Sequence, residues 1–305
     1  NMTGENKFFK YLKIVIGFLV AILFLLPIFI LLMDSFKNQK GILTDVLGWP
    51  NPFIFDNYPK AMEKMNFFNS LWNSVWITVV STALILLFSS MAAWVLVRYK
   101  TKISKLMFIL FAVALLIPFQ CVMLPLMSIM GSKEIFSITF GDAAFALNGL
   151  NILNPFGLVF TYLGFGCSMA IMLYHGFIKG VPEELEEAAM IDGCSMFKTF
   201  WKIVFPLLSP INTTVAILQI MWIWNDYLLP SLVLKEQSWY TLPLQTSKFF
   251  STFTSSWDIA TAALILSMLP VVIFYLIAQK KIIKGVVDGA ITVSYTHLRA
   301  HETRG

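Results

Sequence analysis

Charged residues are scarce in this sequence of 305 residues: aspartate, glutamate, lysine and arginine together make up only 13% of it. A soluble domain usually carries about 25% of such residues. Hydrophobic residues reach 58%, and the mean hydropathy is +0.75. A water-soluble globule is excluded because too few polar side chains are available to cover its surface. A disordered chain is also excluded, since such chains are poor in apolar residues and rich in charge. A membrane protein with several spans remains.

Cysteine and histidine are rare as well, with three residues of each. The cysteines form no C-x-x-C pair, which argues against a disulfide framework or a zinc site. Only His175 lies in the body of the chain, because the other two histidines belong to the C-terminal tail. A haem-binding membrane protein is therefore disfavoured, since it needs histidine ligands on facing helices.

Three further classes of protein lack their sequence signals. The pattern G-x-x-x-x-G-K-[ST] does not occur, so this chain carries no ATP-binding loop of that type. The net charge of +5 is small, and nothing supports nucleic-acid binding. A membrane enzyme would need a cluster of ionisable or metal-binding residues in one plane, and none is visible in the sequence.

Long apolar segments are abundant. A helix needs about 20 apolar residues to cross the hydrocarbon core of a bilayer. Six segments meet this requirement, and an even number of spans places both termini on the same side. The predicted spans are 14–33, 73–97, 106–126, 157–178, 211–233 and 259–277.

Lysine and arginine indicate the orientation, because they concentrate on the cytoplasmic side of membrane proteins. When residues 1–13 are placed in the cytoplasm, the inner segments hold more lysine and arginine than the outer loops. Both termini are therefore expected to be cytoplasmic. The alternative for the first span is a cleavable signal peptide, but residues 33–36 lack the small-x-small cleavage site.

The segment 180–210, between spans four and five, holds the densest cluster of acids in the chain. Pro182 suits the first turn of a helix, and the glutamates that follow it favour a helix N-terminus. Gly193 can take the positive φ that ends a helix, and Ser195 can cap a second one. Pro206 would end or kink that second helix. The segment predicts a cytoplasmic helix–turn–helix hairpin, with an ordinary helical loop as the alternative.

The spacing within this hairpin is specific. It reads E-A-A, three residues, Gly, nine residues, Ile, one residue, a large apolar residue and Pro. The positions are Glu187, Ala188, Ala189, Gly193, Ile203, Phe205 and Pro206. This pattern resembles the signature of the permease subunits of ABC importers. Only Phe205 departs from it, where that family usually has leucine.

The resemblance extends from about Lys10 to Ile291 and is greatest to the sugar-import branch of binding-protein-dependent permeases. Within that branch the chain looks most similar to the smaller permease subunit of maltose-type transporters. The supporting stretches are N-S-V at 73–75, A-A-W at 92–94, R-Y at 98–99, W-N-D-Y at 224–227, Y-T-L-P at 240–243 and K-G at 284–285.

This resemblance implies an all-α membrane protein of six transmembrane helices, with a cytoplasmic coupling hairpin between helices four and five. It implies import of a mono- or oligosaccharide across the bacterial cytoplasmic (inner) membrane by alternating access, by a chain that is not itself an enzyme. The residues expected to couple this chain to an ATPase are Glu187, Ala188, Ala189, Asp192, Gly193, Ile203 and Pro206.

The resemblance also implies the partners. They are an ATP-binding cassette ATPase, a second permease subunit, an extracytoplasmic sugar-binding protein, the sugar and the lipid bilayer. ATP and Mg are expected on the ATPase, so that this chain needs no cofactor or metal of its own. A permease for a different solute of the same superfamily is the main alternative. A self-contained secondary transporter is disfavoured, because such proteins usually show paired repeats and their own ion site.

Polar residues within the spans are candidates for the substrate path. An acid inside a span is a functional hypothesis by default, and hydroxyl-rich sugars suit amides and aromatic rings. The candidates are Gln120, Gln219, Trp222, Asn225 and Asp226. A membrane-interface anchor is the alternative for Trp222, and an interfacial or internally bonded residue is the alternative for Asp226.

Two segments depart from the expected pattern. Residues 131–148 add length between spans three and four, where they either contact the external binding protein or form a lineage-specific loop. Residues 292–305 replace the expected short basic ending with T-V-S-Y-T-H-L-R-A-H-E-T-R-G. We interpret this tail as artefactual, a sequencing-adapter or cloning remnant, and exclude it from the permease domain, which covers 14–291.

Overall fold

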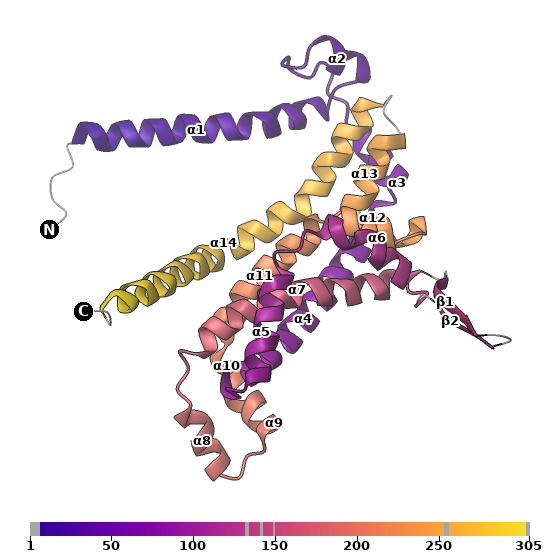
Figure 1. The fold of residues 1–305 in the computed structure, drawn as a ribbon. Helices are drawn as coiled ribbons and strands as arrows, with labels where there is room; N and C mark the ends of the chain where they lie inside the picture. Colours follow the sequence, from indigo (N-terminus) through magenta and orange to yellow (C-terminus); the bar gives the residue numbers. More distant parts are fainter. Residues whose placement is uncertain (1–6, 132–133, 141–142, 149, 253–255, 303–305) are drawn as a thin grey trace. The chain divides into compact units, whose positions relative to one another are not determined.

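The computed structural model describes residues 7–131, 134–140, 143–148, 150–252 and 256–302 (Figure 1). The chain divides into two units, residues 1–70 with 245–272 and residues 71–244 with 273–305. The elements are α1 (Lys7–Asp34), α2 (Gln39–Thr44), α3 (Asn57–Lys64), α4 (Phe67–Arg98), α5 (Lys102–Ala114), α6 (Phe119–Met130), β1 (Glu134–Phe140), β2 (Ala143–Asn148), α7 (Pro155–Ile178), α8 (Glu184–Ile191), α9 (Met196–Thr199), η1 (Phe200–Val204), α10 (Phe205–Leu207), α11 (Ser209–Asn225), α12 (Leu228–Val233), η2 (Gln237–Trp239), α13 (Leu242–Thr252) and α14 (Trp257–Glu302). The predicted helical fold class is confirmed.

Four helices within the described residues are long and apolar enough to cross a membrane, or up to six if each bent pair of helices counts as one span. The four candidate spans are Tyr11–Asp34, Phe67–Arg98, Pro155–Ile178 and Trp257–Gln279. They coincide with predicted spans one, two, four and six. Predicted spans three and five correspond to segments that are broken.

Predicted span three is not a single helix over 106–126. It consists of α5 and α6, whose axes differ by 105° across a short break. The break contains Pro118, which has extended backbone angles and directly precedes α6. Proline has no N–H to donate and disfavours helical angles in the residue before it, so the helix stops there. This correction leaves a broken span or a re-entrant loop at this position.

Predicted span five is also interrupted. Its helix α11 ends at Asn225, and Asp226 has the extended angles φ −76° and ψ 128°. A carboxylate oxygen of Asp226 accepts the N–H of Leu228 at 2.9 Å and that of Leu229 at 3.4 Å. Asp226 therefore separates α11 from α12 and caps the second helix, as aspartate commonly does. The assumption of one continuous helix over 211–233 was wrong.

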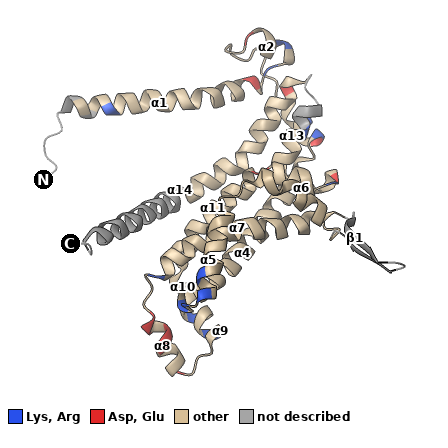
Figure 2. Cartoon of the chain, in the orientation of Figure 1, with Lys and Arg blue, Asp and Glu red and all other residues tan. Residues whose placement is uncertain are grey.

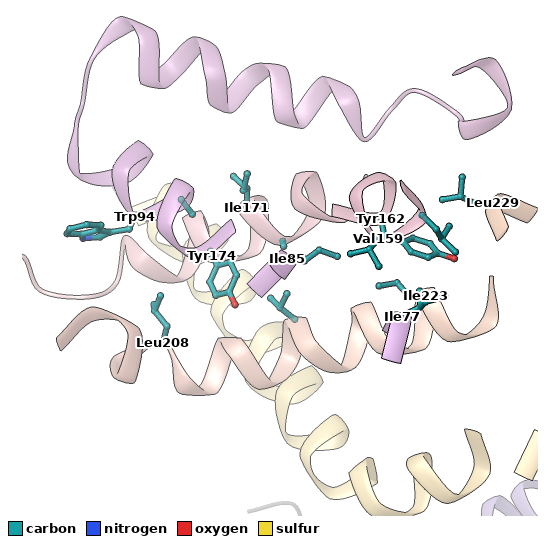
Figure 3. Close-up of a cluster of buried hydrophobic side chains, with 14 of the residues drawn as sticks. Ile77, Ile85, Trp94, Val159, Tyr162, Ile171, Tyr174, Leu208, Ile223 and Leu229 are labelled. Carbon is teal, nitrogen blue, oxygen red and sulfur yellow. The ribbon is translucent and has the colours of Figure 1, made fainter. Parts of the chain in front are cut away.

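The core of the second unit surrounds α7. This helix packs against α5, α11 and α12, and buried aliphatic and aromatic side chains of α4, α7 and α11 interdigitate beside it (Figure 3). Gly166 lies in close contact with α4 and α11, because an added Cβ atom would clash with Cδ1 of Ile85 and lie 3.0 Å from Oε1 of Gln219. The hydroxyl of Tyr174 donates to Oδ1 of Asn212 at 2.7 Å and links α7 to α11.

In the first unit, the loop after α1 has its own polar core. The ammonium group of Lys37 is buried and lies 2.7 Å from a carboxylate oxygen of Asp34. The same group donates to the carbonyl oxygen of Asp45 at 2.8 Å. The amide of Asn57 donates to the carbonyl oxygens of Ser35 and Lys37 at 3.0 and 2.9 Å. These bonds bring both ends of the loop together at the end of α1.

Two predictions outside the helical core remain open. The segment 131–148 contains strands β1 and β2, which pair antiparallel with a register shift between Glu134 and Phe136. Residues 132–133 and 141–142 of that segment lie outside the described residues, as do residues 1–6 and 303–305. The backbone of α14 is helical to Glu302. The role of the 131–148 segment and the origin of the tail stay predictions.

Candidate functional site: the hairpin between α7 and α11

The first limb of the predicted hairpin is α8, and its end is built as the sequence indicates. Gly193 follows the helix with φ +81°. The N–H of Gly193 donates to the carbonyl of Met190 at 3.0 Å, and the N–H of Cys194 donates to that of Ala189 at 2.9 Å. This pair of bonds is a Schellman motif, which closes a helix with a residue of positive φ. The turn of the hairpin is therefore a defined structure rather than an open loop.

The second limb begins at Ser195, whose hydroxyl oxygen accepts the N–H of Lys198 at 3.3 Å. The limb continues through α9, a π-helical turn (η1) and α10. Pro206 was predicted to end or kink this limb, and it lies within α10, which ends at Leu207 before the axis bends by 76°. The wider π-helical turn directly precedes the proline region and accommodates a residue that cannot donate a helical hydrogen bond.

The expected coupling residues separate into exposed and inward-facing groups. Ala189 is buried and Ile203 is half-buried. The remaining five are exposed, and they are Glu187, Ala188, Asp192, Gly193 and Pro206. Large apolar side chains are exposed on the same hairpin, namely Leu185, Met190, Ile191, Met196 and Phe197. The hairpin thus presents acidic and apolar groups together, and Figure 2 shows the acidic residues on α8.

Sequence reasoning missed Glu186, which is only 4% exposed. One of its carboxylate oxygens accepts Nε and Nη2 of Arg98 at 2.9 and 2.7 Å. The other accepts the indole N–H of Trp94 at 2.8 Å. Trp94 and Arg98 are four residues apart on α4, so they lie on the same helix face. Their position in the A-A-W and R-Y stretches was the available signal, but nothing local in the sequence named their acidic partner.

A second, exposed ion pair lies beside this buried one. Nζ of Lys100 is 3.1 Å from a carboxylate oxygen of Glu183, and Nη1 of Arg98 is 3.7 Å from the same oxygen. The hydrogen bond from Lys100, together with the charges of Lys100 and Arg98, lowers the pKa of Glu183 from its ordinary value. An open cavity of about 540 Å³ adjoins the pair and is lined by both signs of charge, including Lys179 and Glu187.

The candidate substrate-path residues of α11 differ in burial and in their contacts. Gln219 is fully buried and donates to the carbonyl of Gly166 at 3.1 Å. Trp222 is 41% exposed, and its ring packs nearly perpendicular to that of Tyr162, with ring centroids 5.5 Å apart. The hydroxyl of Tyr162 donates to Asp226 at 3.0 Å. Tyr162 on α7 is therefore the residue that joins Trp222 to Asp226, and sequence reasoning did not select it.

The two remaining candidates are exposed. The amide of Asn225 donates to the carbonyl of Met221 in its own helix at 2.7 Å. Gln120 lies in the first turn of α6 and is exposed. The structure does not bring Asn225 or Gln120 into the hydrogen bonds that join Tyr162 and Asp226.

Two of the motif stretches meet although they are far apart in the sequence. The amide of Asn73, in α4, donates to the carbonyl oxygens of Ser238 and Tyr240 at 2.8 and 3.2 Å. The N–H of Leu242 donates to the hydroxyl of Ser74 at 2.7 Å. The N-S-V stretch therefore holds the loop that carries Y-T-L-P against α4.

This combination of apolar helices and a capped, exposed hairpin defines a helical membrane protein with an exposed hairpin between two of its helical segments. The sequence profile of the family described as binding-protein-dependent transport system inner membrane component matches residues 85–288, which include the hairpin. The chain belongs to this family. It is therefore an inner-membrane transport subunit of a class that is not itself enzymatic.

Similar proteins agree with this assignment. The chain is 43% identical over 282 residues to the probable starch degradation products transport system permease protein AmyC of Thermoanaerobacterium thermosulfurigenes, covering 92% of this chain and 97% of that protein. It is 34% identical over 290 residues to the multiple sugar-binding transport system permease protein MsmG of Streptococcus mutans, covering 94% and 97%. A solved bacterial ABC transporter involved in import of the acidic polysaccharide alginate contains a chain of the same fold, with TM-score 0.68, 22% identity and coverage of 90% and 96%.

Proposed function

We propose that this chain is the permease subunit through which an ATP-driven importer moves a sugar, either a mono- or an oligosaccharide, into a bacterial cell. The names of the similar proteins support a sugar or a product of polysaccharide breakdown as the solute. The observation that carries the coupling part of the proposal is the hairpin, whose turn is closed by backbone hydrogen bonds and whose outer face is apolar and acidic.

The hairpin is the proposed docking element for the ATPase. Glu187 and Ala188 are exposed on α8, and a carboxylate that becomes buried in an interface needs a cationic or N–H partner. Ala188 leaves room for close approach, whereas Ala189 faces inward and acts within the hairpin. Asp192 and Gly193 form the turn, and Ile203 and Pro206 belong to the limb that leads to α11. ATP and Mg bind to the ATPase, so this chain needs neither.

The remaining partners follow from the proposed direction of transport. A second permease subunit completes the pathway, and an extracytoplasmic binding protein delivers the sugar. Both termini and the hairpin are cytoplasmic in this arrangement, which agrees with the surplus of lysine and arginine in those segments.

Sugar contacts are assigned to the exposed candidates. Trp222 offers a ring face for stacking and Asn225 an amide for hydroxyl groups, and Gln120 offers a second amide. Gln219 and Asp226 already bond to α7, so their proposed role is to shape the pathway rather than to bind sugar. A permease for a different solute of the same superfamily is the alternative.

Purification of this chain in mild detergent from its source cells tests the proposal. We expect an ATPase and a second permease to co-purify, and the ATPase activity to rise when the external binding protein and its sugar are added. A chain that purifies alone and moves solute in liposomes without ATP would contradict the proposal. Stimulation by a non-sugar solute instead would support the alternative.

A further inference from the structure

We propose that Trp94, Arg98 and Glu186 form a rigid clamp that makes α4 move with the hairpin during transport. The inference rests on the proposed function, because it assumes that an ATPase displaces the hairpin. The peptide chain connects the hairpin only to α7 and α11. The clamp adds a third attachment, to a candidate span that is not adjacent to the hairpin in the sequence.

The clamp holds the first limb through a buried, charged contact. The side chains of Arg98 and Glu186 are 11% and 5% exposed. Two N–H groups of the Arg98 guanidinium donate to one carboxylate oxygen of Glu186, and the indole N–H of Trp94 donates to the other. Charged hydrogen bonds of this kind are stronger than neutral ones and fix the geometry of both partners. Separating them would leave a buried charge without its partner, so the contact resists opening.

The clamp also reaches the rest of the hairpin. Nη2 of Arg98 donates to the carbonyl oxygen of Val181 at 3.0 Å, in the linker that precedes α8. The ring of Trp94 packs against Phe200, the first residue of η1 in the second limb, with ring centroids 5.4 Å apart. One face of α4 therefore contacts the entry, the first limb and the second limb of the hairpin. A displacement of any of these parts is transmitted to α4.

The neighbouring ion pair does not have this property. The side chains of Lys100 and Glu183 are 75% and 49% exposed, and exposed pairs contribute little because water and salt screen them. This contrast supplies a test within the same region. Loss of the buried contact should disconnect α4 from the hairpin, whereas loss of an exposed charge should not.

The first experiment compares Glu186→Gln with Glu184→Gln in the purified transporter complex in liposomes. Glu184 is an exposed residue of the same helix, so its variant controls for the change of charge. We expect Glu186→Gln to hydrolyse ATP but to move about tenfold less sugar per ATP, since one partner of a buried charge pair is removed. We expect Glu184→Gln to keep the wild-type ratio. An unchanged ratio in Glu186→Gln, or an equal loss of uptake and ATP hydrolysis, would overturn the clamp.

The second experiment restores the attachment by another bond. Cysteines replace Lys100 and Glu183 in a chain whose native cysteines are serine, and a reducible thiol cross-linker joins them. A contact that stays closed throughout the cycle predicts that the cross-linked protein transports normally and that cross-linking raises the sugar-to-ATP ratio of Glu186→Gln. Uptake that stops on cross-linking and returns on reduction would mean that the contact opens, and would overturn the inference. If Glu186→Gln assembles poorly, cross-linking of the otherwise wild-type chain still tests whether the contact opens during transport.

Failure of the proposed function gives a different result. In that case the wild-type complex itself shows no ATP-dependent uptake of sugar. Failure of the clamp alone leaves wild-type uptake intact and the ratio of Glu186→Gln unchanged.

Discussion

The hydroxyl of Tyr162 donates to one carboxylate oxygen of Asp226 at 3.0 Å, while the other oxygen of Asp226 caps α12. The acid of predicted span five therefore has donors on both oxygens. Asp226 is half-buried, and because a carboxylate removed from water needs such partners, these bonds explain its presence in an apolar segment without a ligand. Asp226 holds the break between α11 and α12 and ties that break to α7.

This arrangement predicts different effects for two substitutions of Asp226. Asp226→Ala removes the cap and should lower stability by about 0.5–2 kcal/mol. Asp226→Asn keeps an oxygen that can cap and should lower stability less. Thermal unfolding of the detergent-solubilised chain measures both. If Asp226 instead binds substrate directly, the Asp226→Asn variant would show a normal unfolding temperature but a raised KM for uptake.

Gly166 provides a test of the packing between α4, α7 and α11. A methyl group at this position would clash with Cδ1 of Ile85, so Gly166→Ala should destabilise the chain by about 1–3 kcal/mol through overpacking. Ile85→Val removes that atom and should recover part of the loss in the double variant. The matched control is Gly164→Ala in the same helix, where no described atom outside the helix backbone and its neighbours lies within 4 Å. Equal effects of the two alanines would refute the packing argument.

Substitutions of Gly193 test whether the hairpin turn requires a residue of positive φ. Its φ is +81°, and a Cβ atom there would have no described atom within 4 Å apart from its chain neighbours. Within this chain, any effect of a side chain on the unfolding temperature must then arise from conformation and not from crowding. Gly193→Asn should be tolerated, because asparagine adopts positive φ, whereas Gly193→Val should cost about 1–2 kcal/mol. Uptake per assembled complex and unfolding temperature should both decrease in the order glycine, asparagine, valine; a valine variant equal to the asparagine variant would contradict this account.

The pair Lys100–Glu183 predicts a dependence on pH. A hydrogen bond from Lys100 lowers the pKa of Glu183 from its ordinary value of 4.5 in the folded chain. The pair therefore stabilises the fold fully above about pH 4.5, and this contribution disappears as pH falls through the lowered pKa. The effect should be small because Glu183 is exposed. Unfolding temperatures of wild type and Lys100→Gln should differ slightly at pH 6 and converge in more acidic buffer. For the exposed control Lys102→Gln, the difference in unfolding temperature from wild type should not change with pH.

Local patterns were sufficient for part of this structure. The apolar lengths of α1, α4, α7 and α14 identify candidate spans, because the thickness of a bilayer sets the length of an apolar helix. The hairpin turn at Gly193 was also predictable, since a helix end depends on the few residues beside it. The same holds for the family resemblance, which rests on the spacing of residues within this hairpin.

The candidate site was predicted less completely. The E-A-A stretch named Glu187, but the structure places the neighbouring Glu186 in the buried contact with α4. Among the substrate-path candidates, Gln219 is inside the core and Tyr162 was not selected. Each of these facts depends on contacts between side chains of different helices. A local stretch of sequence does not contain that information.

The sequence by itself determined that this chain is a helical membrane permease with a capped hairpin, because span length, capping and motif spacing act over short stretches. Only the tertiary structure decided the hydrogen bond from Tyr162 to Asp226 and the pairing of Arg98 with Glu186, which join positions 64 and 88 residues apart. Such contacts depend on how helices from distant parts of the chain pack. Burial then selects, among several similar acids, the one whose partners can satisfy its charge.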